Sequence, residues 1–367
     1  MYIHELREWP RFSWRPEAVK ELLSLAYAKL RTLQDDLNKL GFDEQTEASL
    51  RVLTEEAVKT SEIEGEKLDP QKVRSSIARK LGLPEGGLHV NDHRVDGIVE
   101  VVLNASQKCD QPLTKERLFS WHGALFPTGY SGLSKILVGQ WRDDSDGPMQ
   151  VVSGPYGHRR VHFEAPGHLR VPGEMDGFLK WFENETSLDP LLKAGIAHLY
   201  FVTIHPFDDG NGRIARAIAD MALARADKMT QRYSSMSAQI TFEKEDYYDT
   251  LESTQKGTLE ITNWLVWFLE CLVRAIDRAE KVLIDILLKA RVWKSLTGFE
   301  INDRQREILN RLLDKTFYGE LGTAKYSKMM KCSPDTSNRD LNQLVEYGVL
   351  ERTGKGKGTR YHLRLPA

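Results

Sequence analysis

Apolar residues recur about every 3.6 positions along most of this chain. In the stretch 18–40 they fall at Val19, Leu22, Leu23, Leu25, Ala26, Leu30, Leu33, Leu37 and Leu40, which places them on one face of a helix. The same repeat predicts helices at 47–63, 71–81, 92–107, 114–125, 174–184, 190–203, 213–226, 246–253 and 261–288. The pattern therefore predicts a mainly α protein.

The helical repeat is lost between about Gly129 and Gly173. Two short runs rich in β-branched residues, MQVVS (149–153) and RVHFE (160–164), are separated here by the glycine-containing segment GPYGHR. Such a pair predicts a β-hairpin from Met149 to Phe163. It is the only hairpin expected in an otherwise helical middle domain.

The last 75 residues have a different character. A helix at Arg304–Leu313 precedes a second at Thr323–Met330, a turn at Cys332–Pro334, a third helix at Asp335–Tyr347 and a glycine-rich hairpin that ends at Tyr361. This order is typical of a winged helix, an α+β module in which a helix-turn-helix is followed by a hairpin.

Composition excludes several classes of protein. Of 367 residues, 41% are hydrophobic and 28% charged, with a net charge of −2, which is ordinary for a soluble globular chain. Its three cysteines, Cys109, Cys271 and Cys332, form no CxxC pair, which argues against a disulfide framework or a cysteine zinc site. The start MYIHELREWP has no signal-peptide pattern, and the longest apolar stretch, Trp264–Leu269, is too short to cross a bilayer. A cytoplasmic protein without membrane contact is expected.

The segment 205–216, H-P-F-D-D-G-N-G-R-I-A-R, carries the candidate chemistry. His205 ends one predicted helix and is the one group here that accepts a proton near neutral pH. Two glycines flank Asn211 at the start of the next helix, where backbone N–H groups form an anion site. Asp209 suits a hard cation such as Mg²⁺, and Arg213 and Arg216 suit phosphate. Together these groups indicate nucleotide phosphate chemistry.

Each of these residues also has a purely structural interpretation. His205 could be a helix-end histidine bonded to backbone, and Asp209 could cap the following helix. Arg213 and Arg216 could be solvated helix residues. The combination of all four in twelve residues favours the functional interpretation.

The segment resembles the signature of Fic proteins, His-x-Phe-x-(Asp/Glu)-Gly-Asn-Gly-Arg-x-x-Arg, and every fixed position matches. The resemblance covers roughly residues 45–285. It implies a helical Fic core and transfer of AMP from ATP to a Ser, Thr or Tyr hydroxyl of a target protein, or of the enzyme itself. It further implies Mg²⁺ as cofactor and ATP and the target protein as partners.

The resemblance also implies a role for each motif residue. His205 would be the catalytic base, Phe207 would pack beneath the loop, and Asp209 would hold Mg²⁺ against the phosphates. The remaining positions would bind ATP. The anion hole for its phosphates would be formed by Gly210, Asn211 and Gly212, and the distal phosphates would be bound by Arg213 and Arg216.

Two further regions resemble the family less specifically. The predicted hairpin stands where Fic proteins keep a flap that docks the target segment as an added strand. Its candidate docking residues are Val151, Val152, Ser153 and Gly154. Tyr247, Tyr248 and Gln255 stand where relatives line the adenosine pocket, although they could equally be core and helix surface.

Residues 60–65, Thr-Ser-Glu-Ile-Glu-Gly, resemble the inhibitory motif (Ser/Thr)-x-x-x-Glu-(Gly/Asn) of one Fic class. Thr60 and Glu64 are one helical turn apart, and Gly65 ends the turn. The resemblance implies that Glu64 pairs with Arg216 and holds ATP in an unproductive pose. The alternative is an acidic run on a solvated helix face.

Three parts are therefore expected: an N-terminal helical region with the inhibitory helix (1–88), the Fic core with its flap (89–288) and the winged helix (289–367). The C-terminal stretch 303–364 has 13 Lys+Arg against 8 Asp+Glu, a net charge of +5. The basic residues of its wing, Lys355, Lys357 and Arg360, suit DNA backbone contact. Asp335, Asp340 and Glu346 on the preceding helix favour protein contact instead, and both partners stay open.

Three other functions are compatible with the same residues. The site could remove AMP, with Glu64 orienting water, or it could transfer another nucleotidyl or phosphoryl group. The chain could also be a transcriptional regulator that uses the core only to sense nucleotide. The target protein and the oligomeric state, including a homodimer, are left open by the sequence.

Overall fold

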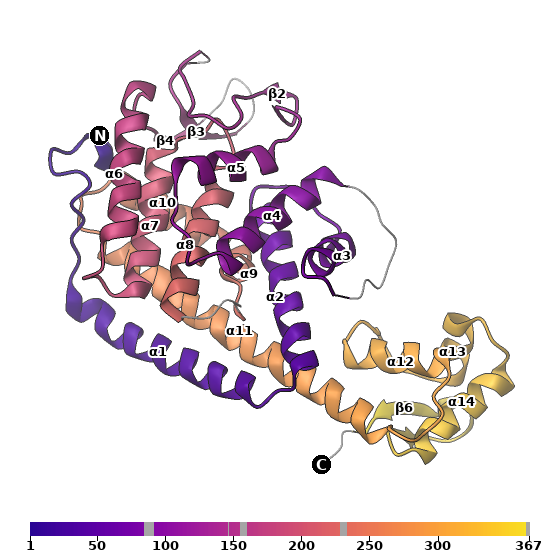
Figure 1. Cartoon of the computed structure of the whole chain (residues 1–367). Coiled ribbons are helices and arrows are strands. Elements are labelled where there is room, and N and C mark those ends of the chain that lie inside the picture. Colours follow the sequence, from indigo (N-terminus) through magenta and orange to yellow (C-terminus); the bar gives the residue numbers. More distant parts are fainter. Residues whose placement is uncertain (84–91, 146, 155–159, 228–232, 365–367) are drawn as a thin grey trace. The chain divides into compact units, whose positions relative to one another are not determined.

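The computed structural model describes residues 1–83, 92–145, 147–154, 160–227 and 233–364 (Figure 1). These residues form two compact units. The first comprises Met1–Asp36 and Ala48–Ala279, and the second Leu37–Glu47 and Glu280–Ala367. The first unit thus contains residues of both expected parts, 1–88 and 89–288.

The first unit is built around two buried helices, α7 (Pro190–Ile204) and α8 (Asn211–Asp227), which lie side by side (Figure 1). Nearly every side chain of α7 is buried, as expected of a helix that is apolar all round. Asp189 caps its start by accepting hydrogen bonds from the backbone of Leu191 and Leu192, and Pro190 takes the first helical position.

Other helices surround this pair. Within the first unit, α4 (His93–Gln107) packs against α8, α5 (Lys115–Leu125) and α3 (Pro70–Lys80), and α6 (Val171–Asn184) packs against α7. Two shorter helices follow α8. They are α9 (Met236–Phe242) and α10 (Lys244–Gln255).

Three long helices contribute residues to both units: α1 (Pro16–Asn38), α2 (Phe42–Ile63) and α11 (Thr262–Ser295). The short 3-10 turns η1 (Ile3–Glu5) and η2 (His168–Arg170) complete the helical elements of the first unit. No helix in the described part of the chain combines the length and apolarity that crossing a bilayer requires.

The predicted hairpin is present, as β3 (Gln150–Ser153) paired antiparallel with β4 (Arg160–Glu164). Its connecting residues 155–159 lie outside the described residues. The expectation of a single hairpin is wrong, because β1 (Tyr130–Ser131) and β2 (Ser134–Lys135) form another. Two-residue strands around Gly132 (φ 57°) leave no alternating pattern that a sequence could reveal.

The C-terminal part of the second unit contains the predicted helices and hairpin in the predicted order. They are α12 (Asp303–Leu313), α13 (Thr323–Met330), α14 (Pro334–Glu346), β5 (Leu350–Thr353), the 3-10 turn η3 (Gly356–Gly358) and β6 (Arg360–Leu363). Their shared core is formed by Ile308, Leu309, Leu313, Leu321, Tyr326, Leu341, Leu344, Val349, Leu350 and Tyr361.

Asp340 does not lie on the exposed face of α14, contrary to the expectation that it makes this helix acidic. Its side chain is buried and accepts hydrogen bonds from Arg304, Tyr326 and Asn302. Three donors around one carboxylate satisfy its buried charge, so Asp340 ties α12 and α13 to α14.

Candidate active site

His205 lies at the C-terminal end of α7 in a left-handed backbone conformation (φ 52°). Its Nδ1 is 3.1 Å from the carbonyl oxygen of Val202, so Nδ1 carries the hydrogen and donates it. The lone pair of Nε2 is then free to accept a proton. Burial lowers the pKa of His205 to about 4, which keeps the ring neutral near pH 7.

The loop after His205 is closed by the side chain of Asn211. Its Oδ1 accepts from the backbone N–H of Phe207 at 3.0 Å, and its Nδ2 donates to the Phe207 carbonyl at 2.7 Å. This side chain is therefore used to shape the loop, and only the backbone N–H of Asn211 remains for an anion. Gly210 has φ 80°, and a Cβ there would lie 2.8 Å from the ring of Phe126, so glycine is required.

His122, which the sequence analysis did not single out, supports the same loop from α5. Its ring stacks on Phe207 with centroids 4.2 Å apart. Gly139 donates its N–H to Nδ1, and Nε2 lies 3.2 Å from the carbonyl oxygen of Asp209, so Nε2 carries the hydrogen. Burial lowers the pKa of His122 to about 4, and the ring is neutral. We interpret His122 as a positioning residue.

The two aspartates of the loop have different environments. Asp208 accepts a hydrogen bond from the backbone N–H of Leu137 at 2.8 Å, which ties the loop to the β1–β2 region. Asp209 accepts from the hydroxyl of Ser131 and the N–H of Gly210, and its side chain is 43% exposed. The Asp209 carboxylate therefore remains accessible to solvent despite these two hydrogen bonds.

In the described ranges, no cluster of three or more His, Cys, Asp or Glu side chains is arranged to hold a metal ion. A site with one carboxylate still fits Mg²⁺, because this ion usually keeps several waters and binds one or two carboxylates together with substrate phosphates. Asp209 is the residue that would hold it.

Arg216 is bound by the predicted inhibitory segment. Its Nε donates to the hydroxyl of Thr60 at 2.8 Å, and its Nη2 donates to the carbonyl of Thr60 and to Glu64 Oε1 at 2.7 Å. Gly65 follows with φ 84° and turns the chain after α2. A Cβ on Gly212 would lie 2.3 Å from Glu64 Oε1. The Glu64 carboxylate therefore lies against the first turn of α8, where the helix attracts anions.

Arg213 has a carboxylate partner of its own, Glu66, which the sequence analysis missed. Arg213 Nη1 donates to Glu66 Oε2 at 3.2 Å, and the guanidinium lies over the ring of Phe126, 5.0 Å from its centroid. Among the described residues, Arg213 Nε and Arg216 Nη1 are buried without a hydrogen-bond partner. Both arginines thus retain donors for an anion.

A cavity of about 430 Å³ brings about half of the predicted site residues together. It is lined by Glu64, Val151, Val152, Ser153, His162, Phe163, Val202, His205, Gly212, Tyr247, Tyr248, Leu251, Glu252 and Gln255. Its volume falls within the range of small-ligand pockets. The other predicted residues are not among its lining: Thr60, Gly65, Gly154, Asp209, Gly210, Asn211, Arg213 and Arg216.

The three predicted adenosine-pocket residues are held by different contacts. Tyr247 is buried with its hydroxyl 3.2 Å from His198 Nε2, whereas Tyr248 is 40% exposed. Burial raises the pKa of Tyr248 to about 12, so its hydroxyl keeps its proton. Gln255 donates to the hydroxyl of Thr203 at 3.2 Å.

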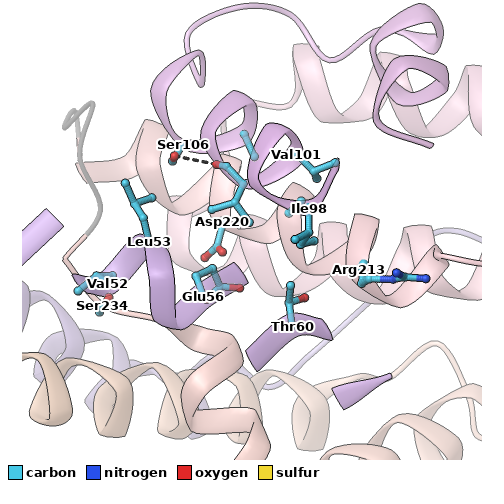
Figure 2. Close-up of a pocket in the computed structure, with 13 residues that line it drawn as sticks. Val52, Leu53, Glu56, Thr60, Ile98, Val101, Ser106, Arg213, Asp220 and Ser234 are labelled. Atoms are coloured by element: carbon cyan, nitrogen blue, oxygen red, sulfur yellow. Dashed lines mark hydrogen bonds between the residues drawn. The ribbon is translucent and has the colours of Figure 1, made fainter. Parts of the chain in front are cut away.

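A second, much smaller cavity of about 20 Å³ lies between α2, α4 and α8 (Figure 2). The polar residues Glu56, Thr60, Asp220 and Arg213 are among those that line it, together with apolar ones. Its volume suits about one water molecule and excludes a nucleotide. The candidate nucleotide site is therefore the larger cavity beside His205.

Comparisons with known proteins agree with this geometry. Residues 112–223 match the Fic/DOC family, and this segment contains the β3–β4 hairpin and the whole 205–216 motif. The chain therefore carries a Fic domain, as its motif predicts. Residues 2–83 match a domain of unknown function, DUF4172.

Curated relatives match parts of the chain. A probable protein adenylyltransferase of Aquifex aeolicus (strain VF5) is 26% identical over 145 residues, which cover 40% of this chain and 36% of that protein. The protein adenylyltransferase Fic of Culex quinquefasciatus is 32% identical over 126 residues, 32% of this chain and 24% of that protein. The chain thus matches less than two fifths of the length of each.

Solved structures share the fold. A Fic family protein from Desulfovibrio desulfuricans G20 has a TM-score of 0.56 at 22% identity, covering 97% of this chain and 98% of that one. A Fic domain containing signaling protein from Bacteroides thetaiotaomicron VPI-5482 has a TM-score of 0.52 at 21% identity, covering 73% and 97%. The predicted mainly α fold with small hairpins is confirmed.

Proposed function

We propose that this chain transfers AMP from ATP to a Ser, Thr or Tyr hydroxyl of a target protein. The observation that carries the proposal is His205, whose Nε2 is free to accept a proton in a cavity that Gly212 of the first turn of α8 also lines. The Fic domain and the relatives named protein adenylyltransferases support the same reaction.

Each group of the site then has one task. His205 Nε2 takes the proton of the target hydroxyl as its oxygen attacks the α-phosphorus, and pyrophosphate leaves. The first N–H groups of α8, Arg213 and Arg216 bind the phosphates of ATP. Mg²⁺ held by Asp209 would supply positive charge to these phosphates. His122 and Asn211 hold the loop in shape.

The flap supports docking of an extended target segment. β3 pairs only with β4 among the described strands, which leaves its other edge free for main-chain hydrogen bonds. Val151 and Val152 are 37% and 40% exposed and line the cavity, so a strand added here would run past His205.

We further propose that the resting chain is autoinhibited. Glu64 lies against the α8 turn and on Arg216, so it competes with the phosphate that would bind there. The helices and hairpin of residues 303–364 are proposed to be a winged helix, and a cytoplasmic setting is proposed from the composition.

The direct test is incorporation of AMP from ATP labelled on its α-phosphate. We expect label on proteins of a lysate, located by mass spectrometry on hydroxyl side chains. Label from the γ-phosphate would show phosphoryl transfer instead. Binding of ATP without any incorporation would favour the nucleotide-sensing regulator.

Replacing Asp209 with Ala is expected to raise the Mg²⁺ concentration for half-maximal transfer at least about tenfold. Asp208 is already bonded to the backbone of Leu137 and does not replace it. The measurement is a Mg²⁺ titration of AMP transfer, with Asp143→Ala as the control, since Asp143 hydrogen-bonds Ser145 and is not part of the loop that holds Asp209. Coincident titration curves for Asp209→Ala and the unmutated chain would contradict the assignment.

The pH profile should show no acid limb from His205 near neutrality. Because burial lowers its pKa from 6.5 to about 4, the imidazole is already in its basic form well above pH 4. We therefore expect kcat/KM for ATP to stay level from about pH 6 to about pH 8 and to fall only toward pH 4. An unshifted histidine would halve the rate near pH 6.5, and such a limb would disprove the inferred neutral ring.

Glu66→Gln is expected to lower the KM for ATP by up to about fivefold when made in a Glu64→Gly chain. It frees Arg213 from a partly exposed ion pair, whose worth is ~0–1 kcal/mol. Glu62→Gln is the matched control, because Glu62 pairs with Lys59 on the same segment. Equal KM values for the two glutamine variants would show that Glu66 does not compete with ATP.

A further inference from the structure

The large cavity contains a second imidazole besides His205, and it is joined to a hydroxyl and a carboxylate. Ser153 Oγ, at the end of β3, lies 2.5 Å from His162 Nε2 on β4. His162 Nδ1 lies 2.5 Å from Glu252 Oε2 on α10. All three side chains line the cavity that His205 also lines.

The charge of Glu252 decides the direction of these hydrogen bonds. Hydrogen bonds from Lys256 above all, and from His162 and Arg160, lower the pKa of Glu252 to about 2. The carboxylate is therefore ionised at neutral pH and accepts the Nδ1–H of His162. Nε2 then has its lone pair directed at Ser153, whose O–H donates to it. A carboxylate, an imidazole and a hydroxyl joined in this order form the arrangement that activates serine nucleophiles.

We propose that Ser153 is a site of self-adenylylation, with His162 as its own general base. The inference rests on the proposed function and names one acceptor for the same cavity. Ser153 Oγ attacks the α-phosphorus of ATP and its proton passes to His162 Nε2. The bond from the α-phosphorus to the bridging oxygen breaks, and pyrophosphate leaves.

Modification of Ser153 would affect the docking of target proteins, because of where this residue lies. It ends the flap strand whose free edge is proposed to dock target proteins, next to Val152. An AMP group on Ser153 would occupy both the cavity and the end of that edge. Self-adenylylation should therefore slow transfer to other proteins as it accumulates.

A structural interpretation competes with this one. The hydrogen-bond chain fastens the flap to α10, and Arg160 adds a further contact to Glu252 at 3.2 Å. If these hydrogen bonds only fasten the flap, they orient β3 and leave the Ser153 hydroxyl unmodified. The two interpretations differ in whether AMP appears on Ser153 and in whether its labelling depends on His162 more than transfer to other proteins does.

The experiment incubates the full-length Glu64→Gly chain with ATP and locates AMP by fragmentation of the tryptic peptide 143–159. This peptide also holds Ser145 and Tyr156, which serve as internal comparisons. We expect AMP on Ser153 at a rate independent of protein concentration, because the reaction is intramolecular. S153A should remove the label and S153T, which retains a hydroxyl, should keep it. S145A should change nothing.

The assignment of the base has its own variants. H162Q should slow labelling of Ser153 by roughly 10²-fold or more, whereas transfer to target proteins, for which His205 is the proposed base, should fall far less in the same variant. Unchanged labelling of Ser153 in H162Q, or an equal loss of transfer to target proteins, would overturn His162 as the base. AMP on target proteins but none on Ser153 would overturn the inference and leave the proposed function intact. No AMP on any protein would contradict the proposed function itself.

Discussion

Replacing His205 with Ala is expected to lower AMP transfer to target proteins about 10²- to 10⁴-fold, the usual contribution of a general base. ATP binding should change little. The phosphates are bound by the first turn of α8 and by Arg213 and Arg216, none of which depends on the imidazole. The ring is neutral, and its Nδ1 is occupied by Val202, so its one free lone pair is at Nε2.

The measurement compares transfer rates and ATP affinity in a Glu64→Gly chain with and without the substitution. Ala at φ 52° costs about 1–2 kcal/mol of backbone strain, so loss of activity could reflect a damaged loop. His205→Asn avoids this, because asparagine tolerates the left-handed conformation and cannot act as a base at neutral pH. His168→Ala, outside the cavity lining, is the control. Transfer at the unmutated rate by either His205 variant would require another base.

The sequence revealed those site residues that lie close to one another along the chain. His205 and Arg216 are eleven residues apart: His205 ends the strongly apolar helix α7, and Arg216 lies within α8. A helix end, a glycine-flanked turn and a helix start then follow from periodicity and backbone preference alone. Thr60 and Glu64 were found in the same way, because they lie one helical turn apart in a short motif.

Contacts between distant segments could not be read from the chain. His122 lies 87 residues before Asp209, and nothing in its own helix distinguishes it from an ordinary core histidine. Ser131 belongs to a hairpin too short to predict, yet it bonds the proposed metal ligand. Glu66 lies 147 residues before Arg213, just beyond the recognised motif. Each of these contacts depends on how helices pack.

Local pattern also did not reveal how buried polar side chains are used. The backbone of Asn211 was expected at the anion site, and its side chain, for which the sequence made no prediction, bonds both backbone groups of Phe207. Asp340 was expected to face solvent and is instead enclosed by three donors. In both cases a buried polar group found partners within the fold, because leaving it unpaired would cost about 1–3 kcal/mol.

Glu64→Gly is expected to raise AMP transfer, both to itself and to targets, by about 5- to 150-fold, the range given by a coupling free energy of 1–3 kcal/mol. Arg216 is almost fully buried, and its Nη2 is 2.7 Å from Glu64 Oε1. The same oxygen lies against Gly212 in the first turn of α8. One carboxylate thus occupies both a guanidinium and a helix N-terminus, two groups that would otherwise bind a phosphate.

The directions in which the thermal midpoint and the rate of AMP transfer change separate autoinhibition by Glu64 from its alternatives. Removing Glu64 leaves Arg216 buried without its charge partner, so the thermal midpoint of the chain without nucleotide should fall. Transfer should rise in the same protein, because ATP phosphates can now take the place of the carboxylate. A solvated surface glutamate would change neither quantity, since exposed pairs are worth only ~0–1 kcal/mol.

If Glu64 instead activates water to remove AMP, the variant should also lose de-adenylylation, which is measured on a labelled target. Glu62→Gly, made at the same end of α2, is the control for a glycine introduced there. A lower thermal midpoint combined with unchanged transfer would mean that Glu64 stabilises the fold without restraining the reaction. Autoinhibition by Glu64 predicts that stability falls while activity rises. Reduced stability with unchanged activity would therefore contradict it.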